Sequence, residues 1–334
     1  MEREFAKLTI TPKAERSARA GHPWVYGEEI TSVEGTYKNG DIVDVFSQKG
    51  KWLGSGFVND HSKIRVRLIS RDTNARFDEA FWSRRVRYAI DYRKTVMGDD
   101  FDDCRLIFGE ADQFPGFTVD KFGDILVTEC LSLGIEQRKD VLYAALREVL
   151  AEYGCPVKAI YERNESAIRT LEGLPLEKGF YAADGLSVHE DGKTEIVENG
   201  IRYLVDYIEG QKTGFFLDQK YNRLAVARIS KGKKVLDCFT HTGAFALNAA
   251  AAGAEHVTAV DISEDALNVA RENARRNGLE DRTEFVCADV FDYLTELANT
   301  KQKPYDLIIL DPPAFTKSSK TVRNAFGGYK EINY

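Results

Sequence analysis

The chain reads Val235-Leu236-Asp237-Cys238-Phe239-Thr240-His241-Thr242-Gly243 at the start of its C-terminal third. This is a short apolar strand that opens into a tight turn, and the small residues at 244–252 then predict a helix. A strand, a turn and a helix in this order bring backbone N–H groups and a helix N-terminus to the end of the strand. The pattern is typical of a site that binds a nucleotide-like ligand.

The same alternation of strand and helix continues along the chain. We expect strands at 234–238, 257–260, 284–287 and 306–310, separated by helices at 244–252 and 264–277 and by one that ends at 298. This order predicts an α/β fold with a doubly wound, Rossmann-like parallel sheet. Open sheets of this kind usually have about six or seven strands. We therefore expect a domain that is shortened at its C-terminus.

Two further regions precede this fold. Residues 1–72 predict short strands separated by turns such as Asn39-Gly40, which form a small β-rich domain. Residues 73–190 predict mixed strands and helices, beginning with a helix at 78–94, in an α+β middle domain. The third domain is expected at 191–334 and opens with a hairpin, 194–198 and 201–205, joined by Asn199-Gly200.

Charge and composition limit the class of protein. The formal net charge of -7 argues against a protein that coats nucleic acid uniformly. Residues 63–94 nevertheless hold ten basic residues against four acidic ones, so this segment could follow a phosphate backbone or simply be solvated. Within 63–69, apolar residues alternate with Arg65 and Arg67, which places both guanidinium groups on one strand face. The candidate RNA-binding residues are Lys63, Arg65, Arg67, Arg84 and Arg85.

Other classes receive no support. Five cysteines without a Cys-x-x-Cys pair predict neither a zinc site nor a disulfide framework, so we expect no bound metal. A secretion signal and a long apolar run are both missing from the sequence, so we expect a cytoplasmic protein without a membrane partner. A nicotinamide oxidoreductase is disfavoured because the Gly-x-Gly-x-x-Gly pattern is missing.

Two acidic strand ends extend the candidate site. Asp261 closes the second strand, where its carboxylate can accept hydrogen bonds from two ribose hydroxyls. Asp311-Pro312-Pro313-Ala314-Phe315 follows the fourth strand, and its prolines stiffen a loop that presents a carboxylate beside an aromatic ring able to stack a base. Such a loop suits methyl transfer to a flat ring. The preceding segment 210–219 is either a ligand wall or only the entry of a helix.

These motifs resemble the bacterial large-subunit ribosomal RNA methyltransferases of the PUA-domain type, which use S-adenosylmethionine (SAM) to methylate cytosine at C5. The resemblance covers essentially the whole chain. Its carriers are the segments at 21–26, 54–59, 110–117, 213–219, 237–245 and 311–315. It implies a PUA-like RNA-binding barrel at 1–72, a linker domain at 73–190 and a class I methyltransferase domain at 191–334. It also implies SAM as cofactor and ribosomal RNA as partner; a homodimer is one expected assembly.

The resemblance also assigns roles to residues of this sequence. Asp237 and Gly243 would hold the methionine end of SAM, Asp261 the ribose, and Asp289 with Val290 the adenine. Asp289 could instead cap the helix that follows it. The other residues expected at the cofactor are Thr213, Gly214, Phe215, Phe216, Gln219, Arg223, Phe239, Thr242 and Ile262. Asp311 and Phe315 would be catalytic and hold the target base.

Two departures from the family pattern affect the chemistry. Phe239 and His241 replace the first two glycines of the general pattern Asp-x-Gly-x-Gly-x-Gly. Methylation at C5 of cytosine also needs a thiolate that attacks C6, and the resemblance places that cysteine after the fourth strand, so we expect it beyond Tyr334. We expect Cys238 and Cys287 to pack in the sheet. Methylation of guanine at N2 or N7 is an alternative, as is a noncatalytic RNA-binding or assembly protein that retains the cofactor fold.

Overall fold

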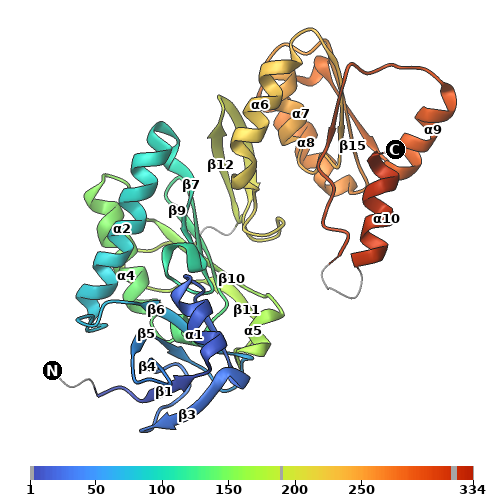
Figure 1. The fold of residues 1–334 in the computed structure, drawn as a ribbon. Coiled ribbons are helices and arrows are strands. Elements are labelled where there is room, and N and C mark those ends of the chain that lie inside the picture. The colour runs from blue at the N-terminus through green and yellow to red at the C-terminus, as the bar shows by residue number, and fades with distance from the viewer. Residues whose placement is uncertain (1–3, 189–190, 317–321, 334) are drawn as a thin grey trace. The chain divides into compact units, whose positions relative to one another are not determined.

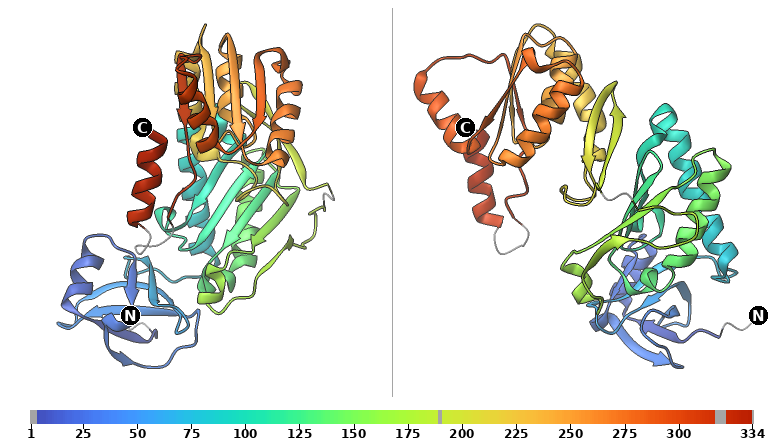
Figure 2. Two further views of the ribbon diagram at one scale, coloured as in Figure 1. Left: turned by 90° about the vertical axis from the view of Figure 1, so that its right-hand side faces the viewer. Right: turned by 180° about the vertical axis from the view of Figure 1, so that it is seen from behind.

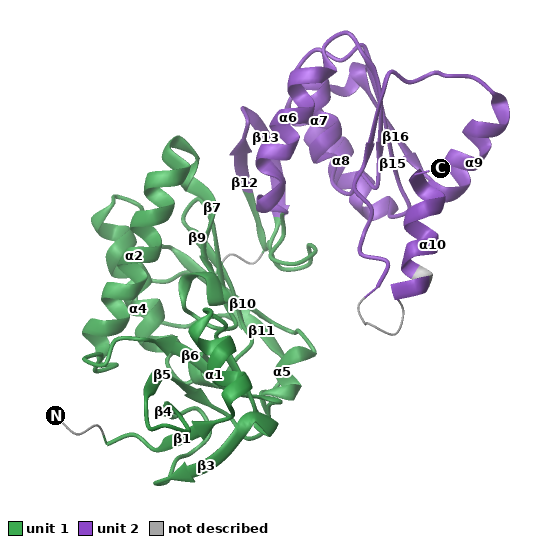
Figure 3. Cartoon of the chain, in the orientation of Figure 1, with its two compact units in different colours: residues 1–194, 206–215 green, residues 195–205, 216–334 purple. Residues whose placement is uncertain are grey.

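Two compact units make up the chain in a computed structural model that describes residues 4–188, 191–316 and 322–333 (Figure 1). Unit 1 comprises residues 1–194 and 206–215, and unit 2 comprises residues 195–205 and 216–334 (Figure 3). The chain therefore enters unit 2, returns briefly to unit 1 and then completes unit 2.

Unit 1 begins with a six-stranded sheet in the order β2-β6-β5-β4-β1-β3. β1 pairs with β4 in parallel, and the other pairings given for this sheet are antiparallel. Its strands are β1 (Lys7–Ile10), β2 (Trp24–Tyr26), β3 (Ile30–Glu34), β4 (Ile42–Ser47), β5 (Trp52–Val58) and β6 (Ile64–Ser70). Helix α1 (Pro12–Arg19) starts at Pro12 because Thr11 caps it, accepting from the N–H of Ala14. The β-rich N-terminal region expected from the sequence is confirmed.

A second sheet in unit 1 has the order β11-β10-β9-β8-β7. Its strands are β7 (Asp103–Phe108), β8 (Phe117–Phe122), β9 (Ile125–Cys130), β10 (Ala159–Asn164) and β11 (Glu177–Phe180). Helices α2 (Glu79–Met97) and α4 (Lys139–Glu152) lie together on one face of it, and α3 (Leu133–Glu136) and α5 (Ile168–Leu171) are short (Figure 2). Phe57 of the first sheet stacks on Trp82 of α2, with the ring centroids 5.9 Å apart. One apolar core therefore joins both sheets of unit 1.

The hairpin of β12 (Lys193–Glu198) and β13 (Ile201–Asp206) leads into unit 2. Its turn residues have positive φ, 53° at Asn199 and 78° at Gly200, as the Asn-Gly pair predicts. Helix α6 (Lys220–Ser230) follows the loop at 207–219.

The main sheet of unit 2 is parallel throughout, in the order β16-β15-β14-β17. Its strands are β14 (Lys234–Cys238), β15 (His256–Asp261), β16 (Thr283–Cys287) and β17 (Leu307–Leu310). The helices are α7 (Ala244–Ala251), α8 (Glu264–Arg276), α9 (Val290–Thr300) and α10 (Val322–Asn333). Val235 packs in a core with α7, whereas Leu236 packs with Val290 of α9 on the other face. The predicted doubly wound parallel sheet is confirmed.

The strand register sets the position of the site. Cys238 lies opposite Val260 on one side and opposite Leu310 on the other, and Asp261 lies opposite Cys287. The carboxyl ends of the four strands therefore meet at one edge of the sheet, which is where open α/β sheets bind their ligands.

Candidate functional site

The turn after β14 has an unusual backbone. Phe239, His241 and Gly243 all have positive φ, at 61°, 52° and 82°. These are the three positions at which the general methyltransferase pattern has glycine. The turn therefore keeps the left-handed conformation at two positions that carry side chains, which L-residues adopt only at a cost of about 1 kcal/mol or more each. A side chain at Gly243 would be crowded as well as strained, since a Cβ there would lie 3.0 Å from the Cβ of Ala270 and 3.3 Å from the ring of Phe285.

Asp237 is buried at the centre of this turn, with 1% of its surface exposed. Its Oδ2 accepts from the hydroxyl of Thr240 at 2.6 Å and from the N–H of Ala246 at 3.0 Å. Its Oδ1 is buried without a hydrogen-bond partner among the described residues. Burial first, and then the charges of Asp311 and Asp261, raise the pKa of Asp237 to about 7. A donor or ammonium group of a ligand would satisfy Oδ1 and favour the carboxylate.

Asp261 ties the ends of two strands together. Its Oδ2 accepts from the N–H of His241 at 2.8 Å, and its Oδ1 accepts from the N–H of Ser263 at 2.9 Å. The carboxylate thus fixes the turn after β14 and the entry of α8. Each oxygen of an ionised carboxylate has a second lone pair, so ribose hydroxyls can still donate to it.

His241 was not selected from the sequence, yet it belongs to this turn. Burial lowers the pKa of its imidazole, so the ring is neutral at pH 7. The ring meets Phe216 edge to face, with centroids 5.4 Å apart. Thr240 was missed as well, although a threonine three residues after Asp237 is a signal for a local hydrogen bond to that carboxylate.

Asp289 caps a helix in this structure. Its Oδ1 accepts from the N–H groups of Phe291 at 2.8 Å and Asp292 at 3.4 Å, at the start of α9. Val290 is buried in the core, whereas Ile262 is exposed. The geometry supports the capping role, and the contact with adenine stays a prediction.

Arg223 forms a buried ion pair that sequence reasoning did not find. Only 2% of Arg223 is exposed, and its guanidinium meets Glu198 in a bidentate pair at 2.6 and 2.7 Å. It also donates to the carbonyl of Phe216 at 2.8 Å. Glu198 lies on the same strand face as the buried Ile196, and this period of two could have revealed it. In this arrangement Arg223 holds the segment that carries Phe216 and Gln219; Gln219 accepts from Asn222 at 2.7 Å.

Three further predicted residues belong to unit 1. The hydroxyl of Thr213 donates to Oδ2 of Asp120 at 2.5 Å, and Phe215 and Gly214 are buried. Asp120 also pairs with Arg105 at 2.8 Å. The Thr213 hydroxyl therefore anchors this segment to β8, and the role of the three residues at the cofactor stays a prediction. Thr242 lies in unit 2, where its carbonyl accepts from Asn273 at 3.3 Å.

The loop after β17 brings Asp311 to the same edge of the sheet as Asp237, and the negative charge of Asp311 contributes to the raised pKa of Asp237. Phe315 is half-buried, with its ring 4.5 Å from Tyr329 and 5.8 Å from Phe291. Its contacts are therefore those of a packed side chain, and base stacking by Phe315 stays a prediction.

The cysteines near the strand ends do not have the environment of a nucleophile. Cys238 is buried, which raises the pKa of its thiol to about 12. Cys287 is exposed rather than packed in the sheet, so that expectation is wrong for this residue. Its thiol donates to the carbonyl of Ile262 at 3.5 Å. Desolvation first, and then the neighbouring Glu264, raise the pKa of this thiol. The cysteine expected beyond Tyr334 lies outside the described residues.

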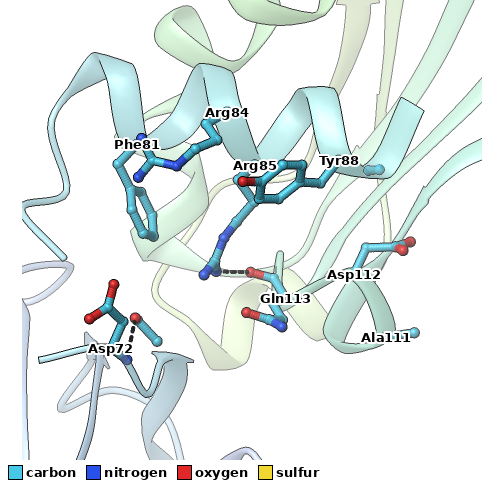
Figure 4. Close-up of a pocket in the computed structure, with 10 residues that line it drawn as sticks. Asp72, Phe81, Arg84, Arg85, Tyr88, Ala111, Asp112 and Gln113 are labelled. Atoms are coloured by element: carbon cyan, nitrogen blue, oxygen red, sulfur yellow. Dashed lines mark hydrogen bonds between the residues drawn. The ribbon is translucent and has the colours of Figure 1, made fainter. Parts of the chain in front are cut away.

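The basic residues of β6 differ in their surroundings. Arg67 is only 8% exposed and pairs with Glu172 at 2.8 Å and Glu110 at 3.4 Å. Its guanidinium therefore links β6 to the turn at Gly109–Asp112 and to the end of α5 instead of lining an open strand face. Arg65 is half-buried and pairs with Asp60, whereas Lys63 is exposed. Arg84 and Arg85 line a cavity beside α2 (Figure 4).

The residues that the structure describes lack two further features. No helix in them is both long enough and apolar enough to span a bilayer. They also contain no cluster of three or more His, Cys, Asp or Glu side chains arranged to hold a metal ion.

Comparisons with known proteins agree with this geometry. The model of a PUA-like domain matches residues 8–71, and that of an S-adenosylmethionine-dependent methyltransferase matches residues 163–330. Ribosomal RNA large subunit methyltransferase I of Klebsiella pneumoniae (strain 342) is 38% identical over 331 residues, covering 98% of this chain and 80% of that protein. The protein of the same name from Aeromonas hydrophila is 39% identical over 334 residues, covering 98% of this chain and 81% of that protein.

Solved structures give the same result. A protein from Streptococcus mutans, described as a SAM-dependent methyltransferase, superposes with a TM-score of 0.75 at 25% identity, over 96% of this chain and 82% of that one. A methyltransferase solved in complex with SAH, S-adenosylhomocysteine, superposes with a TM-score of 0.78 at 25% identity, over 98% of this chain and 82% of that one.

The parallel sheet with its acidic strand ends, joined to a PUA-like domain, defines a SAM-dependent methyltransferase. The chain belongs to the family of the ribosomal RNA large subunit methyltransferases I. Its cofactor is SAM, and the unpartnered Oδ1 of Asp237 fits the α-ammonium group of that molecule.

Proposed function

We propose that this protein transfers a methyl group from SAM to C5 of a cytosine in large-subunit ribosomal RNA. The observation that carries the proposal is the buried, unpartnered Oδ1 of Asp237 at the edge where four parallel strands end. The choice of RNA is supported by relatives that are 38–39% identical over 98% of the chain and are named for the ribosomal large subunit. The choice of C5 is supported by the motif resemblance alone.

The cofactor supplies an electrophilic methyl group on a sulfonium sulfur. The protein's own residues would bind and orient it: Asp237 through its ammonium group and Asp261 through the ribose hydroxyls. Asp261 also fixes the turn at 239–243 through the N–H of His241, so this turn is ordered before the ligand arrives. Fixing donor and acceptor in one geometry is the main source of rate in a displacement of this kind.

Methylation at C5 adds a requirement for covalent catalysis. A cysteine thiolate attacks C6 of the cytosine, C5 then takes the methyl group as the sulfur–methyl bond breaks, and loss of the C5 proton expels the thiolate again. Cys104, Cys130 and Cys238 are buried, and burial raises the pKa of each thiol. Cys287 also has a raised pKa. The remaining cysteine, Cys155, is half-buried in unit 1, where its thiol donates to the carbonyl of Tyr153. We propose that the nucleophile is a cysteine outside residues 1–334.

Guanine methylation at N2 or N7 is the second candidate. It needs no thiolate, so the raised thiol pKa values of Cys104, Cys130, Cys238 and Cys287 are consistent with it. Asp311 could accept a hydrogen bond from the edge of either base.

A homodimer stays a prediction, which sedimentation of the full protein tests.

The test is transfer of a labelled methyl group from SAM to ribosomal RNA from a strain that lacks the gene, followed by digestion to nucleosides. The full gene product is expected to yield labelled 5-methylcytidine, and Cys287→Ala is expected to leave the yield unchanged. Labelled methylguanosine would replace the C5 assignment with the second candidate. Binding of SAH without transfer to any ribosomal RNA would contradict the catalytic proposal and favour a noncatalytic assembly role.

A further inference from the structure

A cavity of about 450 Å³ lies in unit 1, where the segment after β6 meets α2 and the turn at Gly109–Asp112 (Figure 4). The side chains that matter for its chemistry are Asp72, Phe81, Arg84, Arg85, Tyr88 and Gln113. All of them lie far along the chain from the cofactor motifs, and no part of the methyl-transfer chemistry uses them.

Two guanidinium groups give this cavity its charge. In the described part of the chain, neither Arg84 nor Arg85 forms an ion pair with a carboxylate. Their neighbours on α2 do, since Arg87 pairs with Glu152 at 2.7 Å and Arg93 with Asp112 at 2.6 Å. Asp112 is neutralised by Arg93, whereas Asp72 also lines the cavity, so the two guanidinium groups leave a net positive charge that an anionic ligand could neutralise.

Hydrogen bonds and a ring contact fix the position of the Arg85 guanidinium. It donates to the carbonyls of Ile69 and, at 3.0 Å, of Gln113, and its guanidinium lies 4.5 Å from the centre of the Phe81 ring. Burial first, and then the charge of Arg84, lower the pKa of Arg85 to about 10, so it is still a cation at neutral pH. Its position is fixed before any ligand binds, which reduces the entropy lost on binding.

An aromatic surface adjoins the two arginines. Tyr88 follows Arg84 by one helical turn, and 64% of its surface is exposed. Tyr88 and Arg85 line the same cavity and project from the same helix (Figure 4). Tyr92, one turn further along α2, is also exposed. Exposed rings next to cations are the arrangement by which proteins stack the bases of single-stranded nucleic acid and hold its phosphates.

The remaining polar groups fit a nucleotide better than a bare anion. Asp72 and Gln113 line the same cavity. The negative charge of the Asp72 carboxylate would repel a free phosphate ion. Asp72 and the Gln113 side chain can instead hydrogen-bond the amino and carbonyl groups on the edge of a base.

We propose that this cavity binds one unpaired nucleotide of the RNA substrate, with its phosphate at Arg84 and Arg85 and its base on Tyr88. The inference rests on the proposed action on RNA and adds a second contact point for it, separate from the cofactor edge of unit 2. The strand would continue along the exposed face of α2 past Tyr92.

The test measures binding of a fluorescent single-stranded RNA of about ten nucleotides, a length within the range that such sites cover, to the full protein with SAH present. Arg84→Ala and Tyr88→Ala are each expected to weaken binding about five- to tenfold. Arg84→Ala should also reduce the slope of log affinity against log salt by about 0.7. Arg87→Ala is the matched control, because its guanidinium is already neutralised by Glu152, and it should change neither quantity. Unchanged melting temperatures establish that the variants are folded.

Other outcomes separate this inference from the proposed function. Unchanged RNA affinity in both variants, or an equal loss in Arg87→Ala, would overturn the nucleotide site. Competition by inorganic phosphate as strong as that by a mononucleotide would reduce it to an anion site. Methyl transfer to ribosomal RNA with an unchanged KM in both variants would remove the site but keep the function. Binding that depends on Arg84 and Tyr88 without methyl transfer would keep the site and contradict the function.

Discussion

The main-chain N–H of His241 donates a hydrogen bond of 2.8 Å to Oδ2 of Asp261. This contact joins the turn after β14 to the end of β15, and the other oxygen of Asp261 holds the N–H of Ser263. The residue expected to hold the ribose is therefore also the residue that fixes the turn around Asp237. We therefore expect cofactor affinity and local order in unit 2 to depend on the same carboxylate.

Replacing Asp261 should show this double role. Asp261→Ala removes both backbone acceptors and the contacts to the ribose, so SAH affinity is expected to fall on the order of 100-fold, with a lower melting temperature. Asp265→Ala, which removes an exposed carboxylate from the first turn of α8, is the control and should have little effect. Calorimetry that finds equal SAH affinity in wild type and Asp261→Ala would refute the assignment.

Asp237 should make stability depend on pH. The pKa of its carboxyl is about 7 in the fold against an ordinary 3.8, so between roughly pH 4 and 7 the folded protein keeps a proton that the unfolded chain releases. The unfolding free energy of the ligand-free protein should therefore fall as pH rises through this window, by up to roughly 4 kcal/mol. Urea denaturation at pH 5 and pH 8 measures the change. Asp237→Asn should abolish this contribution, and identical pH dependence in the variant would argue against it.

The pair of Arg223 and Glu198 should be essential to unit 2. Arg223→Met leaves Glu198 buried without a partner, which is expected to cost about 3–5 kcal/mol of unfolding free energy. Adding Glu198→Gln should recover most of this stability but not the SAH affinity, because the carbonyl of Phe216 has still lost its donor. A double variant that binds SAH like wild type would show that Arg223 has no role at the cofactor.

Arg65 and Arg67 alternate on one strand but should behave differently. Arg67→Ala leaves the buried Glu172 unpaired and should destabilise unit 1 by about 3 kcal/mol. Arg65→Ala should change stability by less than about 1 kcal/mol but lower RNA affinity and reduce its salt slope by about one. Urea titrations and RNA binding at several salt concentrations separate the two effects. An unchanged salt slope in Arg65→Ala would mean that this residue is only solvated.

Local patterns in the sequence predicted much of unit 2. The apolar runs before Asp237 and Asp261, the small residues of α7 and the Asn199-Gly200 turn are signals within a few residues, and each led to the observed element. The same holds for the edge of the sheet, because parallel strands necessarily align their carboxyl ends.

Contacts between distant segments could not be predicted in this way. Arg67 meets Glu172, 105 positions away, and Thr213 meets Asp120, 93 positions away. The alternation of apolar residues and arginines in β6 does not reveal which distant segment packs over the strand. The sequence therefore predicted Arg67 to be exposed, although Glu172 covers it. The left-handed conformation of Phe239 and His241 was hidden for another reason, since the backbone of the turn overrides the preference of these side chains.

A crystal structure of the protein with bound SAH would test whether the strand-end acids of unit 2 form the cofactor site. We expect the α-ammonium nitrogen within hydrogen-bond distance of Oδ1 of Asp237 and both ribose hydroxyls at Asp261. SAH bound elsewhere, with Oδ1 of Asp237 still buried and without a partner, would contradict this assignment.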